Sequence, residues 1–225
     1  MRLFGPLLAL LVGLSLPQAA RAKGCNIVEN PGFEAGSVGW SWKQQESGWH
    51  SFIPTTEQAH SGTQSALTQL HPGPVMFRAQ IWGAVQEFRL AKLPHKLSLW
   101  FRIEDWRQAV AKQYVQVVIM VHDPRIQRLA SQPQMQLRYI LAGLTEAPYQ
   151  PVNGRYVMAG PALPEQGKWI HFRADVVQDF IKAWGWFPEN FEKMEIFLEV
   201  RYDEPLPENS VVSGKVFWDD LETCP

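Results

Sequence analysis

The stretch KLSLWFRIE at residues 96–104 alternates apolar and polar side chains without a break. In an extended chain, successive side chains point to opposite faces. One face of this stretch then carries Leu97, Leu99, Phe101 and Ile103. The other face carries Ser98, Trp100, Arg102 and Glu104. A period of two with one polar face is typical of a strand in an antiparallel sheet that is wet on one side.

The same alternation continues outward from this stretch. Residues 114–122 place four β-branched residues on one face, and residues 194–202 oppose five apolar residues to Glu195, Glu199 and Arg201. Shorter strand-like runs occupy residues 26–29, 64–70, 75–82, 85–90, 136–141, 155–158, 169–173 and 215–221. Turn residues separate these runs and no βαβ rhythm appears. The sequence therefore predicts an all-β fold, a jelly-roll β-sandwich of about ten antiparallel strands.

One segment has a helical period instead. Apolar residues from Val176 to Trp184 recur at helical spacing, with Asp175 placed as N-cap and Gly185 as C-terminal stop. We expect a short helix over residues 175–185, laid across one end of the sandwich. The Pro- and Gly-rich residues 142–166 predict a long loop, which in a compact domain is either functional or poorly ordered.

The N-terminus reads as a secretory signal peptide over residues 1–22. Arg2 precedes an apolar run of about 14 residues, and Ala20 and Ala22 form a small-x-small cleavage pattern. The run is shorter than the roughly 20 residues of a membrane span, although a retained N-terminal anchor is the alternative. Residues 23–225 would then form one secreted or periplasmic domain without a membrane span.

Charge excludes one class of partner. Cleavage after residue 22 removes two of the 21 basic residues and leaves 19 against 22 acidic ones. No cluster of lysine and arginine stands out, so the sequence predicts no nucleic-acid partner and no binding to anionic lipid.

The two cysteines, Cys25 and Cys224, lie at opposite ends of the mature chain. In an oxidising compartment an even pair predicts a disulfide bond, which requires the first and last strands to lie side by side. The alternative is a lipidated Cys25, but Lys23 fits a lipobox poorly and Cys224 would be left over.

Three short motifs carry a family resemblance. They are NPGFEAG at residues 30–36 with Gly39-Trp40 behind it, HSGTQSAL at residues 60–67, and VFWDDL at residues 216–221. Together they resemble carbohydrate-binding modules of the family 4/9 type, which have a galactose-binding-domain-like jelly roll. The resemblance covers about the first 50 mature residues and the last ten, and between them only the strand pattern agrees.

The resemblance also implies a structural Ca²⁺ site. In that family an ion joins the ends of the first and last strands, which carries over to Glu34, Asp219 and Asp220, together with backbone carbonyls of residues 61–64. Carboxylate oxygens of this kind suit Ca²⁺, although two or three side chains fall short of its six to eight ligands. The alternative is that Glu34 caps a turn and the aspartates are ordinary strand-end acids.

Ten tryptophans supply candidate platforms for sugars, because a flat aromatic ring stacks on the apolar face of a pyranose. Those with polar neighbours are predicted to bind ligand: Trp42, Trp49, Trp100 and Trp106. Trp40 matches a buried position of the family and is left out.

No catalytic metal motif, nucleophile elbow or phosphate loop occurs. The sequence thus favours an exported, non-catalytic protein that binds a polysaccharide or glycan. One alternative is a cell-surface or periplasmic domain whose partner is a cell-envelope protein. Another is a jelly-roll polysaccharide lyase or hydrolase, for which one set could assemble: Tyr114, Gln116, His122, Arg138 and Tyr139.

Overall fold

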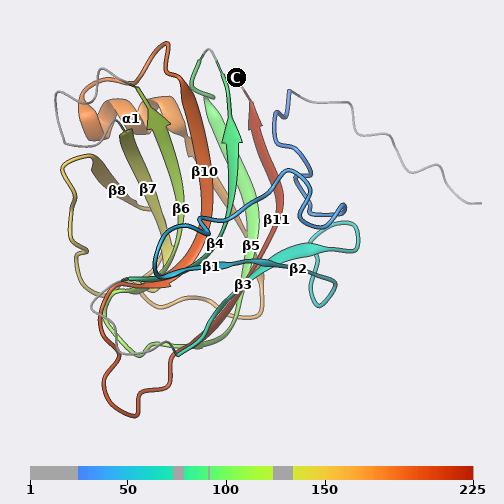
Figure 1. Cartoon of the computed structure of the whole chain (residues 1–225), viewed down its shortest axis with the longest axis vertical. Coiled ribbons are helices and arrows are strands. Elements are labelled where there is room, and N and C mark those ends of the chain that lie inside the picture. The colour runs from blue at the N-terminus through green and yellow to red at the C-terminus, as the bar shows by residue number, and fades with distance from the viewer. Residues whose placement is uncertain (1–24, 73–78, 91, 124–133, 225) are drawn as a thin grey trace, which may run out of the picture.

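The computed structural model describes residues 25–72, 79–90, 92–123 and 134–224. Within these residues eleven strands form two sheets that pack face to face (Figure 1). In spatial order, sheet A contains β1 (Trp49–Ser51), β4 (Gln80–Phe88), β10 (Lys193–Tyr202), β6 (Gln113–His122), β7 (Gln134–Ala142) and β8 (Gly154–Met158). In spatial order, sheet B contains β2 (Ile53–Thr55), β3 (Ser65–Leu70), β11 (Ser213–Cys224), β5 (Lys96–Arg107) and β9 (Trp169–Asp175). The predicted all-β sandwich is confirmed.

The core lies between the two sheets and follows the alternation of the sequence. From β5, Leu99 and Ile103 point inward, and from β10 Ile196 and Val200 meet them in one apolar cluster. Trp218 of β11 is fully buried there, and its indole N–H donates to the Thr68 hydroxyl at 2.9 Å. The outward residues of the same strands remain available to build surface features.

The predicted helix is confirmed as α1 (Val176–Trp184), which lies at one end of the sandwich (Figure 1). The Asp175 side chain accepts a hydrogen bond from the Gln178 amide at 3.0 Å. Gly185 adopts a left-handed conformation with φ 79°, and its amide donates to the Ile181 carbonyl. Both caps therefore stand at the predicted residues.

The predicted disulfide between Cys25 and Cys224 is present, with their Cα atoms 5.2 Å apart. The neighbouring chain is held as well, because the Ile27 amide donates to the Thr223 carbonyl at 3.1 Å. The first described residues thus run beside the last strand, as the pairing of the cysteines requires.

Three details of the prediction were wrong. The pairs β1–β4 and β7–β8 are parallel, so the strands are not all antiparallel. Residues 26–29 are not a strand, and residues 80–88 form one strand where two were expected. The predicted signal sequence, residues 1–22, and residues 75–78 of a predicted strand lie outside the described residues. Among the residues that are described, no helix is both long enough and apolar enough to cross a membrane.

Candidate functional site: a groove on the outer face of sheet A

The outer face of sheet A carries a groove that is lined by charged, polar and aromatic side chains. Its central strand β10 contributes Glu195, Phe197 and Glu199, the residues that alternate with its core positions. Register aligns Phe197 with Val118 of β6 and Val85 of β4, and aligns Glu199 with Gln116. Adjacent strands therefore place polar and apolar side chains in rows across the sheet.

These rows border a groove of about 390 Å³. Its lining comes from β4, β6, β7 and β10, from Trp49 of β1, and from the segment that leads into β1. The lining residues are Lys43, Glu46, Trp49, Ile81, Val118, Met120, His122, Gln134, Gln136, Arg138, Lys193, Glu195, Phe197, Glu199 and Arg201.

One aromatic side chain, the half-buried Trp49, lies on a buried apolar cluster in the groove. The Trp49 ring lies against the Phe197 ring, with centroids 5.8 Å apart and planes tilted by 52°. Phe197, Val85 and Val118 are all buried beneath Trp49, so Trp49 is the ring of this cluster that can meet a ligand. Gly83 allows this approach, because a Cβ atom there would lie 3.0 Å from Trp49 Cζ3 and 2.9 Å from the Leu198 carbonyl oxygen.

A charged cluster forms one end of the groove. Glu195, whose side chain is 4% exposed, accepts from Lys43 Nζ at 2.6 Å and lies 2.8 Å from His122 Nε2. Burial would raise the pKa of the Glu195 carboxyl. Hydrogen bonds from His122 and Lys43 and the charges of Lys43 and Lys193 outweigh burial and lower the pKa to about 2. Glu195 is thus an anion that holds two groove side chains in place.

A second polar network forms the other end. The Glu199 carboxylate accepts from Gln116 Nε2 and from the Arg201 guanidinium, which also donates to Asp203. Gln116 Oε1 is buried without a hydrogen-bond partner among the described residues. The hydroxyl of Tyr114 donates to Asp203 at 2.6 Å. Of these residues Glu199 and Arg201 line the groove, at 3% and 8% exposure, and the network holds both side chains in fixed positions.

The four predicted platform tryptophans do not lie together. Trp49 lines the groove, and Trp42 is half-buried next to the groove residue Lys43. Trp106 is 8% exposed, and its indole N–H donates to Gln108, so its ring is part of the core.

Trp100 is on the outer face of sheet B, between two imidazoles. Its ring stacks on His60 at 3.9 Å and on His171 at 4.4 Å, with interplanar angles of 14° and 8°. Two imidazoles side by side on one indole face would overlap at these distances, so they cover both faces. A ligand could stack on Trp100 only by displacing a histidine, so this ring presents no free face for binding.

The residues predicted to bind Ca²⁺ do come close together. A Cβ atom on Gly32 would lie 3.2 Å from Asp219 Oδ1, 3.8 Å from Asp220 Oδ1 and 4.0 Å from Glu34 Cγ. Burial raises the pKa of Asp219 to about 6, against the effect of its backbone hydrogen bonds.

Hydrogen-bond donors already occupy these carboxylates. Glu34 accepts from the amides of Thr63 and Gln64, and Asp219 accepts from the amides of His60 and Ser61. Asp220 contacts the His60 ring and the Ser61 hydroxyl. Among the described residues, no group of three or more His, Cys, Asp or Glu side chains is placed to hold a metal. As arranged here the side chains do not fit a cation, and Ca²⁺ stays a prediction.

The residue set suggested for a lyase is divided by the fold. Gln116, His122 and Arg138 point outward on sheet A, but Tyr139 packs against Phe172 in the core. Burial raises the pKa of Tyr114 well above its usual value, which keeps its hydroxyl protonated. Both tyrosines are buried, and neither lines the groove.

Sequence reasoning missed Phe197, Lys43 and Lys193 as groove residues. Phe197 left a signal, since it is the apolar residue on the polar face between Glu195 and Glu199. Lys43 and Lys193 left none, because their place depends on how distant segments approach.

Comparison with solved structures gives distant likenesses. No family model matches the chain, and no curated protein matches it. A family 61 carbohydrate-binding module solved with β-1,4-galactotriose superposes with a TM-score of 0.43 and 14% identity, over 88% of this chain and 97% of that one. A family 28 module specific for non-crystalline cellulose gives 0.35 and 15%, over 88% and 94%. The enzymatically active domain of tailspike protein 4 from bacteriophage CBA120 gives 0.46 and 10%, over 89% and 21%. Because the TM-scores of these three structures are below 0.5, we draw no functional conclusion from them.

Proposed function

We propose that this chain is an exported, non-catalytic carbohydrate-binding protein whose groove on sheet A holds a polysaccharide or glycan. The observation that carries the proposal is the half-buried Trp49 ring, which lies on the buried Phe197 between two fixed polar networks. A sugar has apolar C–H faces and a rim of hydroxyls, and the groove offers a surface for each. The signal-like residues 1–22 and the Cys25–Cys224 disulfide support a secreted or periplasmic location.

The charges of the groove favour a neutral glycan. Four cationic residues stand against three carboxylates along its lining: Lys43, Arg138, Lys193 and Arg201 against Glu46, Glu195 and Glu199. Glu195 pairs with Lys43, and Glu199 pairs with Arg201. Little net field remains to select a polyanion.

The test is calorimetric titration of residues 23–225 with a panel of soluble glucans, galactans, mannans and xylans. We expect Trp49→Ala to weaken binding about tenfold or more, because stacking of one aromatic ring is worth about 1.4 kcal/mol. Trp186→Ala is the matched control, since Trp186 is 40% exposed and outside the groove. Absence of binding to every polymer of the panel would overturn the proposal.

The non-catalytic part of the proposal has its own test. A His122 base would have to act while its Nε2 is engaged with Glu195. We expect no new reducing or unsaturated ends when the bound polymer is incubated with the protein. Release of such ends, lost in His122→Ala, would make the chain a hydrolase or lyase instead.

A second candidate function, binding of a cell-envelope protein, rests on one observation. Large apolar side chains are strongly exposed in and beside residues 142–166: Tyr149 at 80%, Val152 at 66%, Met158 at 60% and Leu163 at 72%. Exposed apolar groups that cluster on a surface mark sites of protein interaction. A partner captured by the wild type and by Trp49→Ala, but not by Met158→Ser/Leu163→Ser, would favour this function.

We keep Ca²⁺ as a separate proposal that rests on the family resemblance. Binding would require Asp219 and Asp220 to exchange their present hydrogen-bond donors for the ion. If it occurs, Ca²⁺ at 100 times its dissociation constant adds about 2.7 kcal/mol and raises Tm by roughly 5 to 10 °C. Glu34→Gln should abolish the increase. If Tm is the same in millimolar CaCl₂ and in EDTA, the proposed Ca²⁺ site is refuted.

A further inference from the structure

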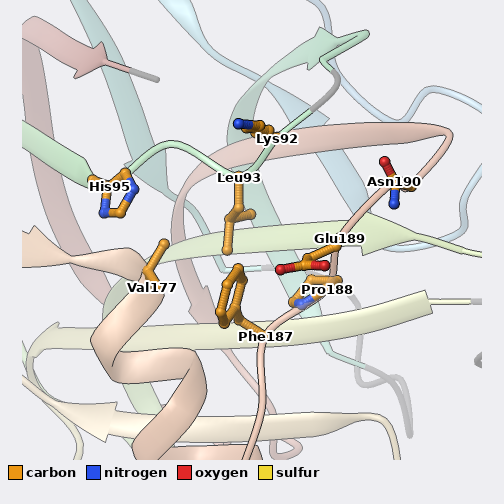
Figure 2. Close-up of a pocket in the computed structure, with 8 residues that line it drawn as sticks. All are labelled: Lys92, Leu93, His95, Val177, Phe187, Pro188, Glu189 and Asn190. Carbon is orange, nitrogen blue, oxygen red and sulfur yellow. The ribbon is translucent and has the colours of Figure 1, made fainter.

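A second hollow lies at the α1 end of the sandwich and shares no lining residue with the proposed glycan groove. Its volume is about 690 Å³. Three segments bound it: the β4–β5 connection with Leu93, the first turn of α1 with Val177, and residues 187–190 ahead of β10. We call this hollow the end pocket (Figure 2).

The floor of the end pocket is apolar. Leu93 and Val177 are 3% and 5% exposed, and Pro188 is buried. Phe187 packs against the main core from its half-buried position, and Figure 2 shows its ring facing Leu93 with Val177 beside them. The volume lies within the range of small-molecule sites, which are typically lined by apolar and aromatic side chains with a few polar groups.

The rim of the end pocket carries two donor side chains, Lys92 and His95. In the part of the chain that the structure describes, neither side chain has a hydrogen bond or an ion pair, and both residues are exposed. The acidic residue of the rim, Glu189, already has an interaction partner. The rim side chains without a partner are an ammonium and an imidazole, which complement an anion placed away from the exposed Glu189 carboxylate.

Two main-chain hydrogen bonds fix the backbone of His95. Its amide donates to the Cys224 carbonyl at 3.1 Å, and its own carbonyl accepts from the Val176 amide at 2.8 Å. The imidazole therefore extends from an anchored backbone beside the apolar floor. Such anchoring reduces the entropy that a ligand contact must overcome.

We propose that the end pocket binds a small amphiphilic anion, an aromatic or short aliphatic carboxylate. Its apolar body lies over Leu93, Val177 and Phe187, and its carboxylate meets Lys92 and His95. This site is independent of glycan binding in the groove.

Three compounds with one ring system and different charge test the proposal: 2-naphthoate, 2-naphthol and 2-naphthylmethylammonium. Calorimetry on residues 23–225 at pH 7 should rank the anion tightest and the cation weakest. Lys92→Gln and His95→Gln should each weaken 2-naphthoate about five- to tenfold and leave 2-naphthol nearly unchanged, because only the anion uses the charge-assisted contact. Lys182→Gln is the matched control, since this lysine on α1 is 74% exposed and outside the pocket.

A second measurement separates this site from the groove. Val177→Phe should fill the floor and weaken all three compounds while glycan binding persists. If that variant does not fold, Lys92→Gln/His95→Gln still tests the anion contact. Any of four results would overturn the proposal. Naphthol and naphthoate could bind equally well, or the rim variants could have no effect. None of the compounds could bind, or binding could be lost in Trp49→Ala.

Discussion

Replacing Glu195 by glutamine should destabilise the protein in a pH-dependent way. The substitution keeps the volume of the side chain but removes the charge that holds Lys43 and His122. The pKa of this carboxyl falls from 4.5 to about 2 on folding, and one unit of pKa is worth 1.36 kcal/mol. The carboxylate thus contributes about 3 kcal/mol at pH 7, an upper figure because Lys43 is 27% exposed.

The sign follows from the direction of the shift. Because the folded pKa is lower than the unfolded one, the contribution is complete above pH 4.5 and is lost as the pH falls toward 2. Urea unfolding should therefore show Glu195→Gln less stable than wild type by about 3 kcal/mol at pH 7 and by about 1.5 kcal/mol at pH 3.

The matched control is Glu165→Gln, an exposed ion pair with Lys168 whose loss should cost less than about 0.5 kcal/mol. Glu195→Gln as stable as wild type at pH 7, or a deficit that does not shrink with acidity, would refute the assignment of Glu195 as a folded-state anion.

Three further substitutions test other parts of the structure. Asp175→Ala removes the N-cap of α1 and should lower the free energy of unfolding by about 1 kcal/mol in urea titrations. An unchanged midpoint would mean that the cap does not contribute to stability. Replacing both Cys25 and Cys224 by serine opens a loop of 199 residues and should cost up to about 5 kcal/mol on the chain-entropy estimate, whereas a loss below about 1 kcal/mol would contradict it. Gly83→Ala puts a methyl group against the Trp49 ring and should weaken glycan binding in calorimetry; unchanged affinity would show that the ring position does not matter.

Local patterns in the sequence predicted the elements whose signals are themselves local. The helix over residues 176–184 could be placed because Asp175 and Gly185 act within one turn of it. The alternation in residues 194–202 correctly separated the inward from the outward face of β10, although the outward side chains are buried as well. The two short strands β1 and β2 were missed, because three residues are too few to establish a period.

The groove itself depends on long-range register and could not be predicted. Trp49 and Trp100 look alike in sequence, since both have polar neighbours. Pairing of β5 with β9 and the approach of residue 60 cover the indole of Trp100 with histidines, whereas Trp49 folds across Gly83 onto the sheet. No local pattern distinguishes these outcomes.

The bridge between Cys25 and Cys224 also decides how the domain responds to mechanical tension. A force applied at these two cysteines is transmitted through the disulfide bond, across the 5.2 Å between their Cα atoms. The chain between them, with a sequence separation of 199, is not stretched. Strands, groove and end pocket then carry no load. In a reducing solution the same pull would pass along the chain, first peeling the residues near Ile27 away from β11.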